Sequence, residues 1–111
     1  MVRLIQHAGM EESWKSHSLV WQLANIGSEV SRSLKNANKP ARFQGAYERA
    51  LELFDITIEY AAEHETAART REVCRAREEF CDYFNGNSFG TDPAKMMRYY
   101  DQFAGICNSG R

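Results

Sequence analysis

Apolar residues along this chain recur at spacings of three and four positions, which is the period of one helix face packed against its neighbours. Four segments carry this pattern, and polar connections separate them. The pattern predicts helices near residues 14–35, 41–63, 66–84 and 93–107. Because the connections are short, we expect consecutive helices to run antiparallel, in an all-α, up-down-up-down four-helix bundle.

Residues with strong capping preferences stand at the ends of these segments. Ser13 and Thr66 are suitable N-caps for the first and third helices. Asp92 is a suitable N-cap for the fourth, because Pro93 follows it at the first helical position. Residues 85–87, with the sequence Asn-Gly-Asn, favour a left-handed cap at the end of the third helix.

Three residues bear on how the helices pack. Gly27 and Gly45 interrupt predicted helices, and a glycine in a helix interior costs about 1 kcal/mol relative to alanine. Gly27 therefore indicates either a place where another helix crosses closely or a glycine that the helix tolerates, and Gly45 again indicates a close crossing. Phe89 is the large apolar residue in the connection before the last helix, and we expect it to tuck back under the bundle.

The pattern places the whole fold in one domain, which agrees with a length of 111 residues. Residues 1–13 show no sustained period and predict an N-terminal arm. Residues 14–107 contain the four helices, and residues 108–111 follow as a tail.

Composition and charge narrow the classes of function. Fourteen Lys and Arg against fifteen Asp and Glu give a formal charge of -1, without the overall basic field of a protein held on nucleic acid by phosphate contacts. A local basic patch stays open as an alternative. No run approaches the ~18 apolar residues that a membrane span requires, so we expect no membrane association.

The cysteines and the first residues bear on the compartment. Cys74 and Cys81 lie about 10 Å apart along a predicted helix, which exceeds the ~7 Å limit for a disulfide. With Cys107 the count is odd, which predicts reduced and mostly buried thiols. Residues 1–10 have neither a secretory nor a transit pattern, so we expect a cytoplasmic protein.

Arg77 interrupts the apolar face of the third predicted helix. It stands between Val73 and Phe80, so we expect it to be largely buried and bonded to acceptors, since an unpaired buried guanidinium would cost several kcal/mol. Glu29 and Asp55 border the apolar stripes of their helices and are the carboxylates placed to supply them. Two interpretations follow: a polar network that fixes how three helices pack, or a cleft that binds an anion such as a phosphate or carboxylate.

The usual catalytic and metal-binding patterns are absent from the sequence. It has no Gly-rich phosphate loop, no His-Glu-x-x-His, no GxSxG elbow and no Glu-x-x-His of the kind that binds metals in helical bundles. We therefore predict no catalytic residues, no metal, no cofactor and no enzymatic activity.

The last predicted helix is apolar over more than one face. Its apolar residues surround the helix axis more fully than one bundle covers, and Met and Tyr are favoured at interfaces. These interface candidates are Met96, Met97, Tyr99, Tyr100 and Phe103. We therefore expect a non-enzymatic interaction module that self-associates as a homodimer or binds a protein partner, with nucleic acid the less favoured partner.

Three sequence words extend over about two thirds of the chain. They are LANIGSEVSR at Leu23–Arg32, AYERALELFDITI at Ala46–Ile58 and REVCRAREEFCDYFNGN at Arg71–Asn87. Together they resemble a family of small prokaryotic all-helical proteins without an assigned function. The features that match this family are Glu29, Asp55, Arg77 and the Asp-Tyr-Phe of residues 82–84.

The helical hairpins also resemble, more distantly, the HEPN class of domains found in toxin-antitoxin and RNA-processing systems. Active members of that class carry an arginine followed four to six residues later by a histidine. Here Arg77 is followed at those distances by Cys81, Asp82 and Tyr83. The resemblance therefore implies, as the alternative function, a divergent and non-catalytic HEPN-like domain associated with RNA or a toxin-antitoxin system.

Overall fold

A computed structural model describes residues 8–109, and helices make up most of them. The helices are α1 (Ala8–Lys15), α2 (Leu19–Lys35), α3 (Pro40–His64), α4 (Ala67–Phe84) and α5 (Pro93–Ser109). Within the described residues there is no strand, so the all-α class is confirmed. None of these helices is both long enough and apolar enough to cross a membrane.

The first predicted helix is divided in two, so a single helix with Ser13 as its N-cap was wrong. Ser18 is the N-cap of α2, and its hydroxyl accepts a hydrogen bond of 3.1 Å from the backbone N–H of Trp21. Trp14 belongs to α1, and its indole Nε1 donates to the Thr57 hydroxyl of α3 at 2.9 Å. The chain turns between α1 and α2 because this bond holds α1 against α3 while Ser18 starts a new helix.

The predicted arm and tail are shorter than expected. Residues 8–13 were predicted as part of the arm, and they lie in α1. Residues 108 and 109 were predicted as tail, and they lie in α5. The remainder of these two predictions, residues 1–7 and 110–111, lies outside the described residues.

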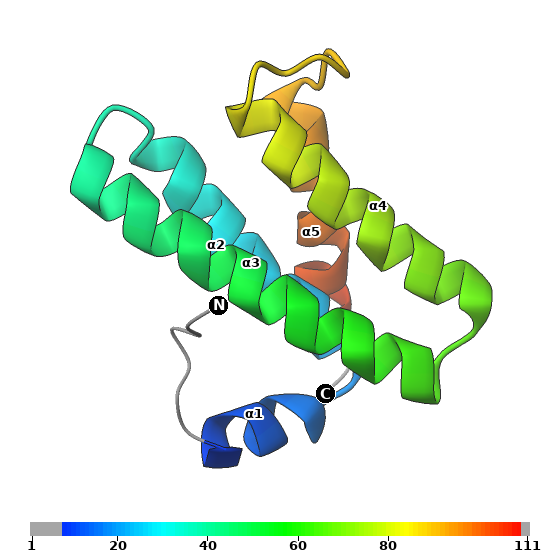
Figure 1. Cartoon of the computed structure of the whole chain (residues 1–111). Coiled ribbons are helices and arrows are strands. Elements are labelled where there is room, and N and C mark those ends of the chain that lie inside the picture. The colour runs from blue at the N-terminus through cyan, green and yellow to red at the C-terminus, as the bar shows by residue number, and fades with distance from the viewer. Residues whose placement is uncertain (1–7, 110–111) are drawn as a thin grey trace.

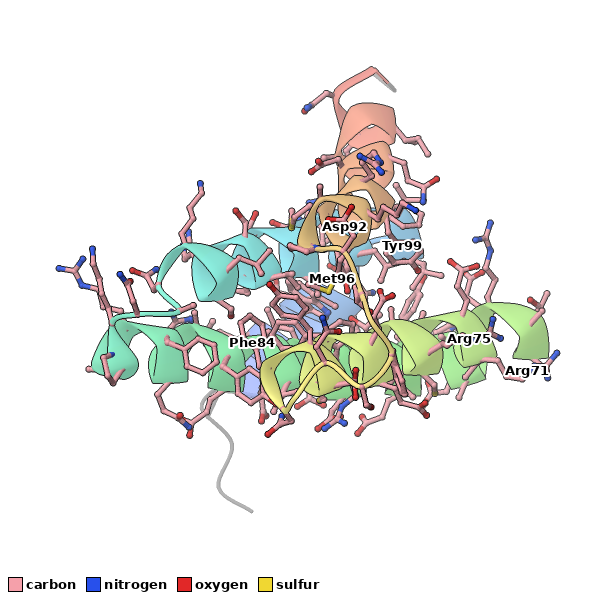
Figure 2. All side chains as sticks on the ribbon, turned by 90° about the horizontal axis from the view of Figure 1, so that it is seen from above. Arg71, Arg75, Phe84, Asp92, Met96 and Tyr99 are labelled. Atoms are coloured by element: carbon pink, nitrogen blue, oxygen red, sulfur yellow. The ribbon has the colours of Figure 1, made fainter. Side chains whose placement is uncertain are left out.

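The four longer helices pack in a bundle-like arrangement around a shared core. Figure 1 shows α2 and α3 side by side, α1 near one end of α3, and α4 running alongside α3 in the opposite direction. In Figure 2, α5 rises steeply from the plane of the other helices. α5 packs mainly against α2 and α4 mainly against α3, so the two consecutive helices α4 and α5 have different principal neighbours.

The crossing of α2 and α5 depends on a glycine. A Cβ atom at Gly27 would lie 2.5 Å from the Cβ of Tyr100, which is closer than packed side chains approach. The predicted close crossing at Gly27 is therefore confirmed. At Gly45 a Cβ would meet only the Arg49 guanidinium of the same helix, at 3.8 Å, so the close crossing predicted there was wrong.

The hydrophobic core lies between the packed helices. All four longer helices contribute buried apolar side chains at helical spacing, as the sequence pattern predicts. The main contributors are Leu23, Ile26, Val30, Phe54, Val73, Phe80, Met96, Tyr100 and Phe103.

Candidate functional site

Arg77 forms an ion pair between α4 and α3. Its Nε donates to Oδ1 of Asp55 at 2.9 Å, which confirms the predicted bond. Its side chain is 33% exposed, so the prediction that it is largely buried was wrong. The buried positions of α4 are Val73, Ala76 and Phe80, and Ala76 takes the core position that Arg77 was expected to fill.

Glu29, the other predicted acceptor, pairs elsewhere. Its Oε2 accepts from Nη1 of Arg32 at 2.7 Å, and its Oε1 lies 3.5 Å from Nε of Arg49 in α3. Because α2 and α4 pack on different parts of α3, the carboxylate reaches arginines of α2 and α3 instead of Arg77. The three residues predicted as one network therefore form two separate ion-pair groups.

Three of the five interface candidates are inside the protein. Met96 and Tyr100 are each 2% exposed and Phe103 is 6% exposed. They are covered because α5 lies close across α2 at Gly27, so one side of α5 is used by the protein's own core. Met97 and Tyr99 are partly exposed and remain accessible from solvent.

A groove of about 610 Å³ opens between α4 and α5. Its apolar lining comes from Ala76 of α4, Met96 and Tyr99 of α5, and Phe89 of the connection between them. Figure 2 shows Met96 and Tyr99 directed from α5 into the region between α5 and α4. The groove exists because α4 and α5 pack on different neighbours and leave the space between them incompletely filled.

Polar contacts join the two walls of this groove. The Tyr99 hydroxyl of α5 donates to Oε2 of Glu72 in α4 at 2.8 Å. Burial, together with this hydrogen bond to a carboxylate, raises the pKa of Tyr99, so its phenol stays protonated and continues to donate. The Thr91 hydroxyl makes a longer bond of 3.4 Å to Glu79. These contacts fix the width of the groove without filling it.

The groove also carries charges of both signs. Glu72, Glu78 and Glu79 line it beside Arg75 and Lys95. Glu72 is already compensated, because Arg69 lies 3.3 Å from its Oε1. The remaining lining therefore contains two carboxylates and two cations, without a net charge.

Phe89 stands on the rim of the groove and is 63% exposed, so the prediction that it tucks under the bundle was wrong. The carboxylate of Asp82 accepts from the Ser88 hydroxyl at 2.6 Å and from the backbone N–H of Phe89 at 2.9 Å. These bonds hold the pKa of Asp82 below its ordinary value. They also fix the backbone that carries the phenyl ring.

The rest of this connection is equally constrained. The Asn87 side chain bonds both backbone groups of Thr91, accepting from its N–H at 2.8 Å and donating to its C=O at 3.1 Å. Gly86, Asn87 and Gly90 have positive φ angles of 100°, 49° and 65°, so the turns use residues suited to that region. The predicted left-handed cap after α4 is confirmed. An apolar ring is thus held toward solvent by an ordered loop.

Comparison with protein-family models, with curated proteins and with solved structures found no match. The two family resemblances therefore stay predictions. Among residues 8–109, no group of three or more His, Cys, Asp or Glu side chains is placed to hold a metal ion. The cysteines Cys74, Cys81 and Cys107 are free and partly buried.

Sequence reasoning missed the groove and the position of Phe89. The groove depends on the directions of α4 and α5, and local sequence patterns do not specify helix directions. The sequence did contain a signal for the loop that carries Phe89. Gly86 and Gly90 flank this apolar residue, and Asp82 precedes it closely enough for its carboxylate to accept from the loop backbone. The same signal is compatible with an inward ring, so only the folded loop distinguishes the two positions.

Proposed function

We propose that this chain is a non-enzymatic helical interaction module of the cytoplasm that self-associates as a homodimer. The observation that carries the proposal is the exposed Phe89 ring, fixed by an ordered loop at the rim of a groove with an apolar floor. Burying a phenylalanine side chain contributes roughly 1.5–3 kcal/mol, so holding one in water forgoes stability that a partner supplies. We interpret the scaffold as an up-down-up-down bundle whose last helix is tilted to open this groove.

The rigidity of the loop supports the same proposal. A contact residue that is already ordered in the free protein loses little conformational entropy on binding. Phe89 meets this condition through the bonds from Ser88 and from its own N–H to Asp82. Aromatic residues surrounded by polar groups are also the residues that most often dominate binding energy at protein interfaces.

Sedimentation velocity across the micromolar range tests the proposal. We expect a concentration-dependent shift from monomer to dimer, because an interface built on apolar burial follows mass action. A chain that stays monomeric throughout this range, and that recovers no defined protein in a pull-down, would contradict the proposed function.

One observation favours a second candidate function, a divergent HEPN-like domain that binds RNA. Arg71 and Arg75 are exposed one turn apart on α4, and neither makes an ion pair within the part of the chain that the structure describes (Figure 2). Filter binding with mixed RNA separates this function from the first, because phosphate contacts predict an affinity that falls steeply with salt. Absence of salt-dependent RNA binding would remove it.

A further inference from the structure

We infer that the groove between α4 and α5 receives Phe89 from a second copy of this chain, in a twofold dimer in which each copy supplies one ring and one groove. This inference rests on the proposed function and names its surface and its partner. The exposed ring and the groove lie on the same surface of the molecule. With a twofold axis beside Phe89, each ring enters the groove of the other copy, and the assembly is complete with two copies.

The projecting part is suited to insertion. Phe89 is 63% exposed, and its backbone is fixed by Asp82 and by the loop that Asn87 and Thr91 close. Its direction is therefore set before any partner arrives. Within the described residues its own protein leaves more than half of its surface uncovered, which a second copy can cover.

The receiving part is suited to an aromatic ring. The groove holds about 610 Å³ and has Ala76, Met96 and Tyr99 as its apolar surface. Tyr99 is partly exposed and supplies a ring, and Met96, at 2% exposed, supplies a thioether at the floor of the groove; aromatic rings and thioethers both make favourable contacts with phenyl groups. The bond from Tyr99 to Glu72 keeps the two walls at a fixed separation, so the site exists before it is occupied.

Charge favours a second copy over an unrelated basic or acidic partner. Apart from Glu72, which Arg69 compensates, the lining carries Glu78 and Glu79 with Arg75 and Lys95. A groove with two charges of each sign attracts neither a strongly acidic nor a strongly basic peptide. Arg75 and Glu78 line the same groove, so we place the twofold axis where Arg75 of each copy faces Glu78 of the other, which makes the two surfaces self-complementary.

The first test compares Phe89→Ser with Met10→Ser by sedimentation. Met10 is also exposed, at 56%, and lies on α1 at the other end of the molecule from the connection that carries Phe89 (Figure 1). We expect Phe89→Ser to raise the dimer dissociation constant by about tenfold or more, and Met10→Ser to change it by less than about twofold. Circular dichroism and a thermal melt establish that both variants keep the fold.

The outcomes separate this inference from the proposed function. If the parent dimerises and Phe89→Ser dimerises equally well, the interface lies elsewhere, so the inference fails and the proposed function stands. If the parent is monomeric and a pull-down recovers a defined protein that Phe89→Ser loses, the groove receives a different protein and the second-copy inference fails. If the parent is monomeric and binds nothing, both fail.

A charge exchange tests the twofold pairing independently of the aromatic ring. We expect Arg75→Glu alone and Glu78→Arg alone to weaken self-association, since each places like charges across the axis. Mixing the two variants should restore dimers, as heterodimers in which opposite charges meet again. Single variants that dimerise like the parent, or a mixture that remains monomeric, would overturn the arrangement.

A photo-crosslink identifies the contact directly. An unlabelled chain that carries a benzophenone amino acid at position 89 is mixed with an equal amount of ¹⁵N-labelled parent chain, and the mixture is irradiated. We expect a covalent link from position 89 of the unlabelled chain to Tyr99 or Met96 of the labelled one. Links found only within one chain would overturn the inference.

Discussion

The two sides of α5 differ in how completely they are packed. Against α2, Gly27 lets the backbones approach until a Cβ would lie 2.5 Å from Tyr100, and the surrounding residues are buried. Toward α4 the same helix leaves a groove of about 610 Å³, joined by the bond from Tyr99 to Glu72. A single helix therefore has one side packed into the core and one side that lines an open groove.

The difference follows from residue size at the crossing points. A glycine at the α2–α5 crossing removes the side chain that would keep the helices apart, so dispersion contacts form along the whole crossing. At the α4–α5 side the neighbouring positions carry long charged residues such as Glu79 and Lys95, which remain hydrated. Stability is concentrated on the first side, and we place recognition on the second.

The largest expected effect is on the tight side. Gly27→Ala should destabilise the fold by about 2 kcal/mol, because a Cβ 2.5 Å from that of Tyr100 places the overpacking cost near the upper end of roughly 1–3 kcal/mol, while better helix propensity returns about 1 kcal/mol. Gly45→Ala is the matched control, and there we expect stabilisation of up to about 1 kcal/mol because the site is open. Urea unfolding measures both. Equal effects of the two substitutions would show that the α2–α5 crossing is not tight.

Tyr99 and Tyr100 are adjacent on α5, and the hydroxyl of each reports on a different side of the helix. Tyr99→Phe should destabilise by about 1–1.5 kcal/mol, because Glu72 loses a donor at the groove. Tyr100→Phe should be neutral or slightly stabilising, because the buried Tyr100 hydroxyl has no hydrogen-bond partner among the described residues. Thermal melts of the two variants test this order, and a larger loss for Tyr100→Phe would contradict it.

The position of α4 depends on its contact with α3, where Arg77 pairs with Asp55. Both side chains are one-third exposed, so we expect Arg77→Ala to cost about 1 kcal/mol, well below the cost of breaking a buried pair. Arg77→Lys should recover only part of this loss, because lysine lacks the directed Nε donor. Denaturant unfolding gives the comparison, and a loss above about 3 kcal/mol would indicate a buried network after all.

The smallest effect concerns the loop that carries Phe89. Since the Asp82 pKa is held low in the folded protein, its contribution to loop stability is present above the ordinary aspartate value of about 3.9 and is lost as pH falls through the folded value. The amide signal of Phe89 should therefore titrate in NMR with a midpoint below about 3.9. Asp82→Asn is the control, in which this titration should disappear.

The sequence by itself determined the all-α class and the ends of the later helices. Periodicity fixes which side of each helix is apolar, and local capping chemistry at Thr66, residues 85–87 and Asp92 acts through bonds only a few positions long. For the same reason Gly27 could be identified from the sequence as a candidate crossing. The division between α1 and α2 was missed because it depends on the bond from Trp14 to Thr57, across 43 positions of sequence.

The tertiary structure alone decided which polar and apolar residues meet. The sequence offered both Glu29 and Asp55 as partners for Arg77. In the structure Arg77 pairs with Asp55, and Glu29 pairs with Arg32, because α2 and α4 pack separately. The direction of α5 buried Tyr100 and left Phe89 at an open groove. Helix directions result from the packing of all side chains together, so local sequence patterns do not specify them.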